Sequence, residues 1–412
     1  MMKEPAFEET GAWPIFFLLF NALTWFYITG IVVQGIIEHL DSTYLQNLVW
    51  ASFYSIIVGS SIFGAIISDK LERFRLLRSW LILGIISPLL TAFSVVTDSI
   101  PIHALTISLF LGFSFGLGMP SCLSCFSEQT SIEHRGKLSG AIFVAANLCA
   151  PIFGVWFTQF GLLFSSIAAS VWCMIGLFFL LLPKQTQRIL AEAKTNAKSI
   201  SFSSVLSDRS FLSYFVAWLM FCFVDRLVLP ALGEHMKDFF FLAYGPIIGS
   251  ISALIGGVLA DRVGRKRVIL YSFATLGIAY AVIGVAPETL FNFSWYLHLI
   301  LGSVAAGMLW VIFILVLWGD LAKGKRAGKY YAIGAIPFFL SEPVLLVSYS
   351  YVSQIPVTSA FSFASFFIFL VVPLLLYAPE TLPKKVIEKR RLQKYLDDVQ
   401  RVKKEYERDS SD

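Results

Sequence analysis

Twelve long apolar segments follow one another along this chain of 412 residues, and they limit its fold more than any other feature. A helix of about 20 apolar residues crosses a hydrocarbon core of about 30 Å. Helices are the expected form because a spanning segment must satisfy its own backbone hydrogen bonds within the bilayer. The segments run over 12–36, 45–68, 78–97, 102–126, 137–158, 162–182, 211–232, 239–260, 268–286, 294–318, 329–352 and 357–378. We therefore predict an all-α membrane protein with twelve transmembrane helices.

The composition excludes other broad classes of protein. Hydrophobic residues make up 57% of the chain and charged residues only 14%, against about 25% charged residues in soluble domains. Such a chain cannot cover a soluble core with polar surface. The sequence thus argues against a soluble enzyme, a disordered chain and a nucleic-acid-binding protein.

The basic residues predict how the chain lies in the membrane. If both termini are cytoplasmic, all of the 32 Lys and Arg except Lys237 and Arg226 fall in cytoplasmic loops, the linker or the tails. Lys and Arg concentrate on the cytoplasmic side of membrane proteins. We predict a multi-pass protein of the cell membrane with both termini in the cytoplasm.

The chain repeats itself once. Asp69 after the second segment and Asp261 after the eighth are 192 residues apart, and so are Glu128 and Asp320 after the fourth and tenth segments. Matches in one register indicate two homologous halves in parallel orientation. The predicted division is an N-terminal six-helix bundle at 1–183, a cytoplasmic linker at 184–210, a C-terminal six-helix bundle at 211–383 and a charged cytoplasmic tail at 384–412.

The loop after the eighth segment carries a specific motif. Gly257 to Lys266 reads G-x-L-A-D-R-x-G-R-K, and Gly64 to Arg75 is a second copy in the equivalent loop of the first half. The first-half copy differs at Ala65, Glu72 and Phe74. An acidic residue followed by Arg-Gly separates the fourth and fifth segments, and Pro-Glu-Thr follows the twelfth.

These motifs resemble the loop signatures of the major facilitator superfamily, and most closely those of its metabolite–proton symporter and sugar-porter branches. The resemblance covers nearly the whole chain and implies two pseudo-symmetric six-helix bundles that move solutes by alternating access. The resemblance to sugar porters is confined to the loops, because the Gln-rich patch that sugar porters have in span 7 is absent from this chain. Ala150, Pro151 and Gly154 match part of the span-5 pattern of antiporters.

The loop charges predict a cytoplasmic gate. A carboxylate at a helix end can cap the positive N-terminus of a helix in the other half. The resemblance implies that Asp69 faces the start of span 11 and Asp261 the start of span 5, while loop Arg and Lys residues pair with Glu128 and Asp320. The alternative is that these charges only fix topology. The candidate gate residues are Asp69, Lys70, Arg73, Glu128, Arg135, Asp261, Arg262, Arg265, Asp320 and Arg326.

Three charged residues lie deep in predicted spans: Asp225, Arg226 and Glu342. A charge at mid-bilayer costs at least about 2.5–3.5 kcal/mol, so it faces protein or water and usually has a role. We hypothesise that Arg226 pairs with Glu342 or with a substrate anion, and that Asp225 or Glu342 carries a coupling proton. The alternative is a static salt bridge within the second half.

Two further polar residues are candidates for the substrate and proton-coupling site. His298 in span 10 is either a proton relay or ligand contact, or an interfacial ring near Trp295. Asn21 in span 1, like Asn147 in span 5, either contacts substrate or is an ordinary packing amide. The predicted site residues are Asp225, Arg226, Glu342, His298 and Asn21.

The predicted function is proton-coupled symport of a small organic solute, and the buried Arg favours an anionic metabolite. The sequence contains no phosphate-binding Gly-Lys-Ser/Thr loop and no catalytic or metal-binding constellation, so we expect neither an enzyme nor a cofactor. The expected partners are the solute, the proton and the lipid bilayer, with the protein as a monomer. The alternatives are an exporter that exchanges protons for a drug or metabolite, and a non-transporting sensor or scaffold.

Overall fold

The computed structural model describes residues 13–182, 200–232 and 239–383, with isolated positions between 386 and 400. In these parts of the chain, twelve helical segments are long and apolar enough to cross a membrane. The helices are α1 (Trp13–Ile37), α2 (Thr43–Lys70), α3 (Arg73–Val96), α4 (Ile100–Gln129), α5 (Arg135–Leu181), α7 (Phe202–Leu206), α8 (Arg209–Val228), α9 (Phe239–Val263), α10 (Arg265–Gly284), η2 (Glu288–Leu290), α11 (Phe291–Val311), η3 (Ile312–Val316), α12 (Leu317–Leu321), α13 (Gly328–Gly334), α14 (Ile336–Val352) and α15 (Val357–Tyr377).

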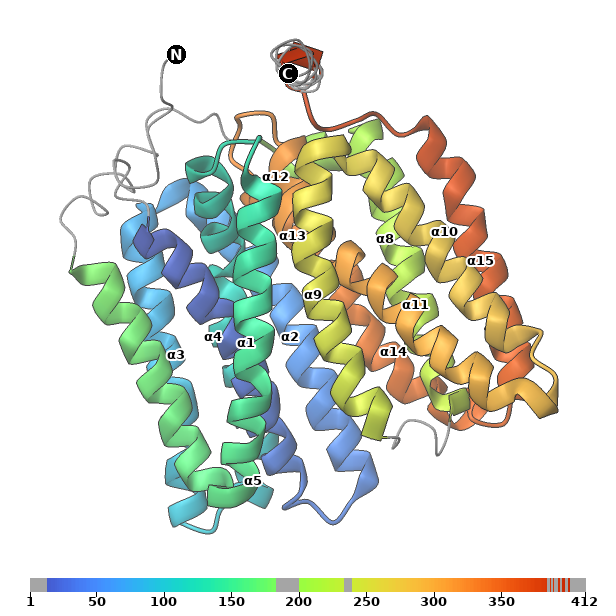
Figure 1. The fold of residues 1–412 in the computed structure, drawn as a ribbon. Coiled ribbons are helices and arrows are strands. Elements are labelled where there is room, and N and C mark those ends of the chain that lie inside the picture. Colours follow the sequence, from blue (N-terminus) through green and yellow to red (C-terminus); the bar gives the residue numbers. More distant parts are fainter. Residues whose placement is uncertain are drawn as a thin grey trace, which may run out of the picture.

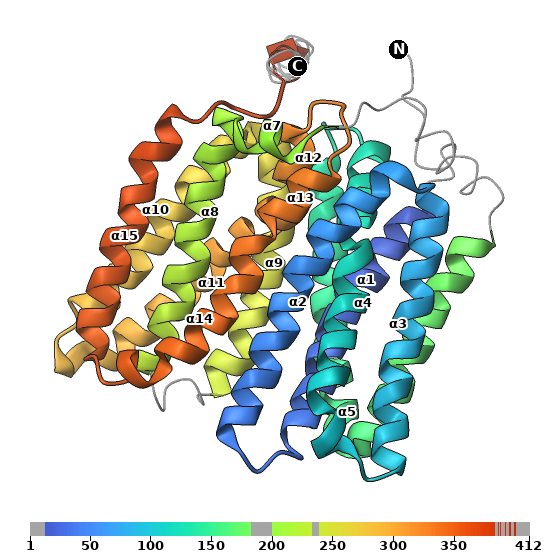
Figure 2. The ribbon, with the colours of Figure 1, turned by 180° about the vertical axis from the view of Figure 1, so that it is seen from behind.

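The spans form two bundles that stand side by side (Figures 1 and 2). Helices α1 to α5 make the first bundle and α8 to α15 make the second. Across the boundary, α5 packs against α9 and α2 packs against α14. These are spans 5 and 8 and spans 2 and 11, so the two contacts are related by the internal repeat. The fold is therefore the predicted one of twelve helices in two pseudo-symmetric bundles of six.

The helices depart from regular α-helical geometry at three places. Helix α5 holds spans 5 and 6, which meet at Gly161, where φ is 71°. Glycine has no Cβ and adopts this conformation without strain. Span 10 consists of α11, the π-helix η3 and α12, and the wide turn is closed by a hydrogen bond from the Leu317 N–H to the Ile312 carbonyl. Span 11 is interrupted between α13 and α14, next to Pro337.

The bundles touch most closely through glycines at the end of the molecule where α2 meets α3 and α9 meets α10, which we call the signature-loop end. A Cβ atom on Gly257 of α9 would overlap the carbonyl oxygen of Gly136 of α5, and the reverse is also true. One turn further along α5, a Cβ on Gly140 would come within 2.8 Å of the Leu254 Cα. Gly257 of span 8 thus packs directly against a helix of the other bundle.

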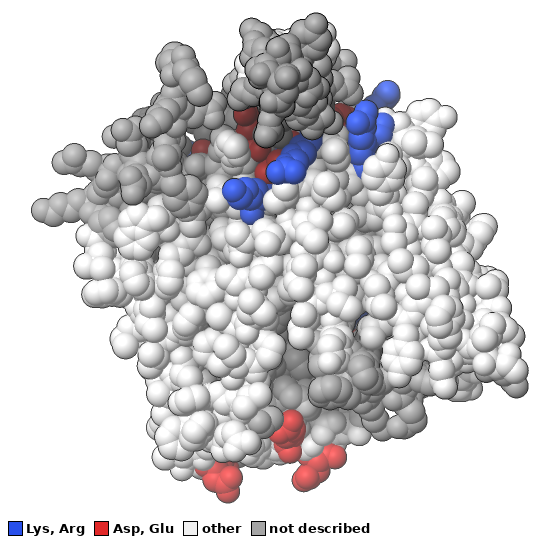
Figure 3. All heavy atoms as spheres, viewed as in Figure 1, with Lys and Arg blue, Asp and Glu red and all other residues white. Residues whose placement is uncertain are grey.

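Some sequence predictions fall on parts of the chain that are not described. Residues 184–199 of the linker, Lys237 and most of the tail after 383 lie outside the described residues. The four-part division with its boundaries stays a prediction, and so does the membrane orientation. On the face drawn in Figure 3, the Lys and Arg side chains lie at the signature-loop end, and only acidic ones lie at the opposite end. The orientation prediction relies on this charge pattern.

Candidate functional site

Asp261 joins the two bundles at the signature-loop end. Its carboxylate accepts hydrogen bonds from the backbone N–H of Gly136 (2.9 Å) and of Lys137 (2.7 Å), which lie in the first turn of α5. It also forms an ion pair of 2.9 Å with Arg265. An anion is stabilised there because the first N–H groups of a helix have no partner within the helix. The predicted placement of Asp261 at the start of span 5 is confirmed.

A buried ion-pair cluster surrounds Asp320. Arg265 Nε lies 2.9 Å from Asp320 Oδ2 within the second bundle, and Arg135 of the first bundle forms an ion pair with Asp320 Oδ1. All three side chains are at most 5% exposed. Arg265 also donates to the Ile132 carbonyl (2.6 Å), which belongs to the first bundle. Charges taken out of water need such complete pairing.

Replacing Asp320 with asparagine is expected to lower the free energy of unfolding by about 3–5 kcal/mol, because the buried Arg135 loses its counter-charge and Arg265 keeps only Asp261. Thermal unfolding of the purified protein in detergent measures this change. Lys70→Gln is the control, since Lys70 is exposed and forms no ion pair among the described residues. An equal unfolding temperature for the two variants would contradict the structural importance of the cluster.

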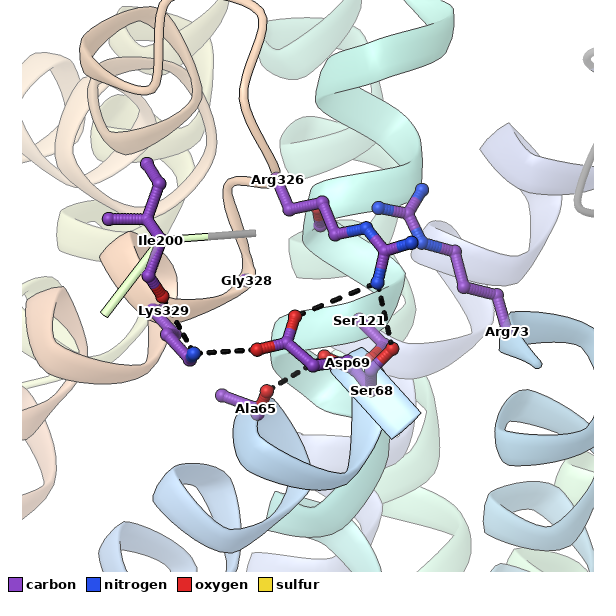
Figure 4. Close-up of a pocket in the computed structure, with 10 residues that line it drawn as sticks. Ala65, Ser68, Asp69, Arg73, Ser121, Ile200, Arg326, Gly328 and Lys329 are labelled. Carbon is purple, nitrogen blue, oxygen red and sulfur yellow. Dashed lines mark hydrogen bonds and ion pairs between the residues drawn. The ribbon is translucent and has the colours of Figure 1, made fainter. Parts of the chain in front are cut away.

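The first half carries a related cluster, shown in Figure 4. Lys329 Nζ lies 2.6 Å from Asp69 Oδ2 and also donates to the Ile200 carbonyl (2.7 Å). Arg326 Nη1 lies 3.6 Å from Asp69 Oδ1. Asp69 therefore lies at the start of span 11, as the family resemblance implied, and its contacts there include the Lys329 ammonium.

The predicted pairing of a loop arginine with Glu128 is also present. The Arg73 guanidinium binds Glu128 through two nitrogens, and the Nη2–Oε1 distance is 2.7 Å. Lys70 and Arg262, by contrast, are exposed and form no ion pair within the described part of the chain. The structure thus brings eight of the ten predicted gate residues into two clusters at the signature-loop end and leaves these two outside.

A cavity of about 640 Å³ lies between the bundles, and we call it the central cavity. It is lined by residues of α1, α2, α4, α5, α8, α9, α11 and α14, among others. Figure 3 shows a hollow between the bundles, nearer the end opposite the signature loops. The contacts of Asp261, Asp320 and Gly257 described above hold the bundles together at the signature-loop end.

Two of the three intramembrane charges form an ion pair in the wall of this cavity. Arg226 Nη2 on α8 lies 2.7 Å from Glu342 Oε1 on α14. The side chains are 27% and 18% exposed, so both are accessible from the cavity while still largely buried. Of the two partners that the sequence analysis offered for Arg226, the structure contains Glu342.

The third charge, Asp225, points to a different partner. The Tyr280 hydroxyl donates a hydrogen bond of 2.9 Å to Asp225 Oδ1. The Tyr280 ring stacks on the His298 ring, with centroids 5.6 Å apart, and His298 Nδ1 lies 3.0 Å from the Ala279 carbonyl. His298 also stacks on Trp295 at 5.7 Å. Asp225, Tyr280 and His298 all line the central cavity.

Asn21 does not join the central cavity. Its amide donates to the Trp172 carbonyl (2.8 Å), and the Trp172 indole donates to the Asn21 carbonyl (3.0 Å). Asn21 is fully buried between α1 and α5, which fits the packing alternative. Asn147 lines the cavity instead, where its side-chain oxygen accepts a hydrogen bond of 2.6 Å from Tyr27.

Comparison with known proteins identifies the family. The sequence model of the Major Facilitator Superfamily matches residues 14–335. The chain belongs to the Major Facilitator Superfamily. The resemblance stated from the loop motifs is thereby confirmed.

Individual members of the superfamily are only distant relatives of this chain. The putative metabolite transport protein YaaU of Escherichia coli (strain K12) is 22% identical over 289 residues, which are 60% of this chain and 64% of that protein. The alignment thus spans slightly less than two thirds of the relative. Relatives this distant support the superfamily but no particular substrate.

Solved structures of the superfamily share the fold. The proton:xylose symporter XylE bound to 6-bromo-6-deoxy-D-glucose matches with a TM-score of 0.69 at 12% identity, over 91% of this chain and 97% of that one. The human organic anion transporter MFSD10 (TETRAN) matches with a TM-score of 0.60 at 16% identity, over 90% of this chain and 100% of that one. At these identities the likeness concerns the fold alone.

Sequence reasoning did not identify three residues that contribute to the contacts described above. Lys329 is nine positions after Asp320, as Lys137 is after Glu128, so the repeat contained a signal for it. Glu380 of the Pro-Glu-Thr motif caps α10, because its carboxylate accepts the backbone N–H of Arg265 at 2.9 Å. Tyr280 had no signal, since one tyrosine in an apolar helix does not reveal which side it faces.

Proposed function

We propose that this protein is a secondary active transporter that carries a small anionic organic solute together with protons by alternating access. The single observation that carries the proposal is the Arg226–Glu342 ion pair in the wall of a cavity between the two bundles. Membership of the superfamily supports the transport mechanism in general. The solute, the proton and the bilayer are the proposed partners, the monomer is the proposed form and the cell membrane is the proposed location.

The contacts at the signature-loop end support a reversible gate. Asp261 holds the first turn of α5, Arg135 reaches Asp320, and Lys329 reaches Asp69, so each contact joins one bundle to the other. Water and loop side chains can replace these partners when the bundles rock apart at this end. We propose that this end faces the cytoplasm, as the distribution of the basic residues predicts, and that a form closed on that side is the one described here.

Charge balance links the solute to the proton. Arg226 carries one positive charge, and Asp225 and Glu342 can carry two negative ones, in the same cavity wall. A solute carboxylate that binds Arg226 displaces Glu342 and leaves it without its cation. An unpaired charge in such a site is costly, and taking up a proton removes that cost. Asp225 can also either stay charged or take up a proton, so either acid can carry the coupled proton.

Two neutral variants test the coupling. Asp225→Asn and Glu342→Gln each remove one acid, and we expect at least one of them to lose uptake driven by a pH gradient while it retains solute exchange between the two sides. Reconstituted vesicles with an imposed pH gradient measure the first activity, and counterflow of labelled solute measures the second. If both variants keep proton-driven uptake at the wild-type rate, neither acid carries the proton.

Export by proton exchange is the second candidate. The partial antiporter pattern at Ala150, Pro151 and Gly154 in span 5 favours it. The same ion pair can serve symport and exchange. In symport the proton and the solute anion occupy the site together, and in exchange they occupy it in turn. Uptake into inverted and right-side-out vesicles under the same pH gradient separates symport from exchange.

A further inference from the structure

Aromatic rings from both bundles line the central cavity beside the ion pair. Phe26 of α1, Trp310 of α11, and Phe338 and Phe339 of α14 belong to its wall. Phe338 lies 5.0 Å from Trp310, 4.9 Å from Phe339 and 5.8 Å from Phe26, measured between ring centroids. These rings form one continuous apolar surface that crosses the boundary between the bundles.

This aromatic surface is next to the charged site. Phe338 precedes Glu342 by four residues on α14, and residues at that spacing are neighbours on one face of a helix. Trp310 is also in contact with Trp218, which lies two turns before Asp225 and Arg226 on α8. A molecule whose carboxylate reached Arg226 would therefore have its body among these rings.

Several polar side chains of the cavity wall are already engaged in hydrogen bonds within the protein. The Tyr27 hydroxyl binds Asn147, the Tyr280 hydroxyl binds Asp225 and the Ser250 hydroxyl binds the Pro246 carbonyl. The Asn147 amide also donates to the Phe143 carbonyl at 2.9 Å. Among the hydroxyl groups of the described wall, those of Tyr54 and Ser303 make no hydrogen bond, and the Trp218 indole N–H in the same wall also has no partner. A solute with many hydroxyl groups would find too few partners here, and each buried unpaired polar group is unfavourable.

We infer that the solute is a carboxylate with an apolar body of about one or two rings, and not a hydroxylated acid or a sugar. Its carboxylate takes the place of Glu342 at Arg226, and its body packs among Phe26, Trp310 and Phe338. The cavity volume lies in the range of about 300–1,000 Å³ that is usual for small-molecule sites. The carboxylate part rests on the proposed function, and the apolar body is the new element.

Four probe molecules separate the contribution of the apolar body of the solute from that of its carboxylate. The dissociation constants of 3-phenylpropionate, 3-phenylpropionamide, gluconate and sorbitol are measured on the full-length protein in detergent by calorimetric titration at one pH. We expect 3-phenylpropionate to bind at least about tenfold more tightly than each of the other three, because it alone offers both a carboxylate and an aromatic body.

A matched pair of variants tests whether the apolar body of the solute packs against Phe338. Phe338→Leu is expected to weaken binding of 3-phenylpropionate by about fivefold to tenfold, as expected for the loss of an aromatic contact, and to leave gluconate unchanged. Phe363→Leu is the control, because Phe363 is 66% exposed on α15 and is not part of the cavity wall. Leucine retains apolar volume, so both variants are expected to fold.

The outcomes distinguish failure of this inference from failure of the proposed transport of an anionic solute. If gluconate binds as tightly as 3-phenylpropionate, the apolar body is wrong while carboxylate recognition stands. If the amide binds as tightly as the acid, carboxylate recognition fails while the apolar body stands. Absence of binding by both phenyl probes, or equal effects of Phe338→Leu and Phe363→Leu, overturns the inference.

Discussion

Replacing Arg226 with alanine is expected to reduce solute uptake by about a hundredfold or more. The change removes the proposed partner of the solute carboxylate and leaves Glu342 without its cation in the cavity wall. A hydrogen bond to a charged partner contributes about 1.5–3 kcal/mol, and we expect the upper value for the solute contact because a guanidinium can bind a carboxylate through two nitrogens. About 3 kcal/mol corresponds to about a hundredfold in rate. Initial uptake rates in vesicles, normalised to the reconstituted protein, measure the effect.

Three further variants make the Arg226 result specific. Arg226→Lys keeps the charge but loses the two-pronged geometry of the guanidinium, so partial activity is expected. Arg75→Ala removes an arginine whose side chain is 72% exposed and should transport like the wild type. If Arg226→Ala combined with Glu342→Ala transports normally, the pair has only a structural role.

Replacing Gly257 with valine is expected to abolish transport while solute binding persists. The backbones of α5 and α9 touch at Gly136 and Gly257, so a side chain at Gly257 has no space in this closed form. The variant should remain separated at the signature-loop end and fail to complete the transport cycle. Spin labels at Lys70 and Arg262, both exposed and on opposite bundles, should report a longer distance than in the wild type.

Gly59 provides the control for this prediction. It lies on α2, and an added Cβ there would have nothing within 4 Å. Gly59→Val should therefore leave both the uptake rate and the spin-label distance unchanged. Equal transport by Gly257→Val and Gly59→Val would mean that the α5–α9 contact is not closed during the cycle.

The parts of the structure that sequence reasoning predicted are those in which few arrangements are physically possible. Long apolar segments have one spanning form, so the twelve helices followed directly. Charges deep in those segments need partners, so Glu342 was one of the two partners expected for Arg226. The family resemblance implied that loop Arg and Lys residues pair with Glu128 and Asp320, and Arg73 and Arg265 occupy these places. The position of Asp261 at α5 came from the family resemblance.

The features that could not be predicted depend on how each helix is rotated about its own axis. An apolar sequence hardly restricts this rotation. When every face of a helix is hydrophobic, the side that meets the cavity is decided by packing against neighbours. Asn21 and Asn147 were equivalent candidates, yet Asn147 lines the cavity and Asn21 binds Trp172. The pairing of Arg135 with Asp320 across the bundles was equally hidden, because it depends on how the bundles approach each other.

The π-helix η3 in span 10 has a mechanical consequence. It separates Trp310, in the cavity wall, from Asp320, in the cluster at the signature-loop end. A π turn contains one residue more than an α turn, and if that extra residue shifts along the helix, the segment it passes turns by about 100° without losing its hydrogen-bonded form. The span therefore need not act as a rigid rod between the cavity wall and the cluster at the signature-loop end.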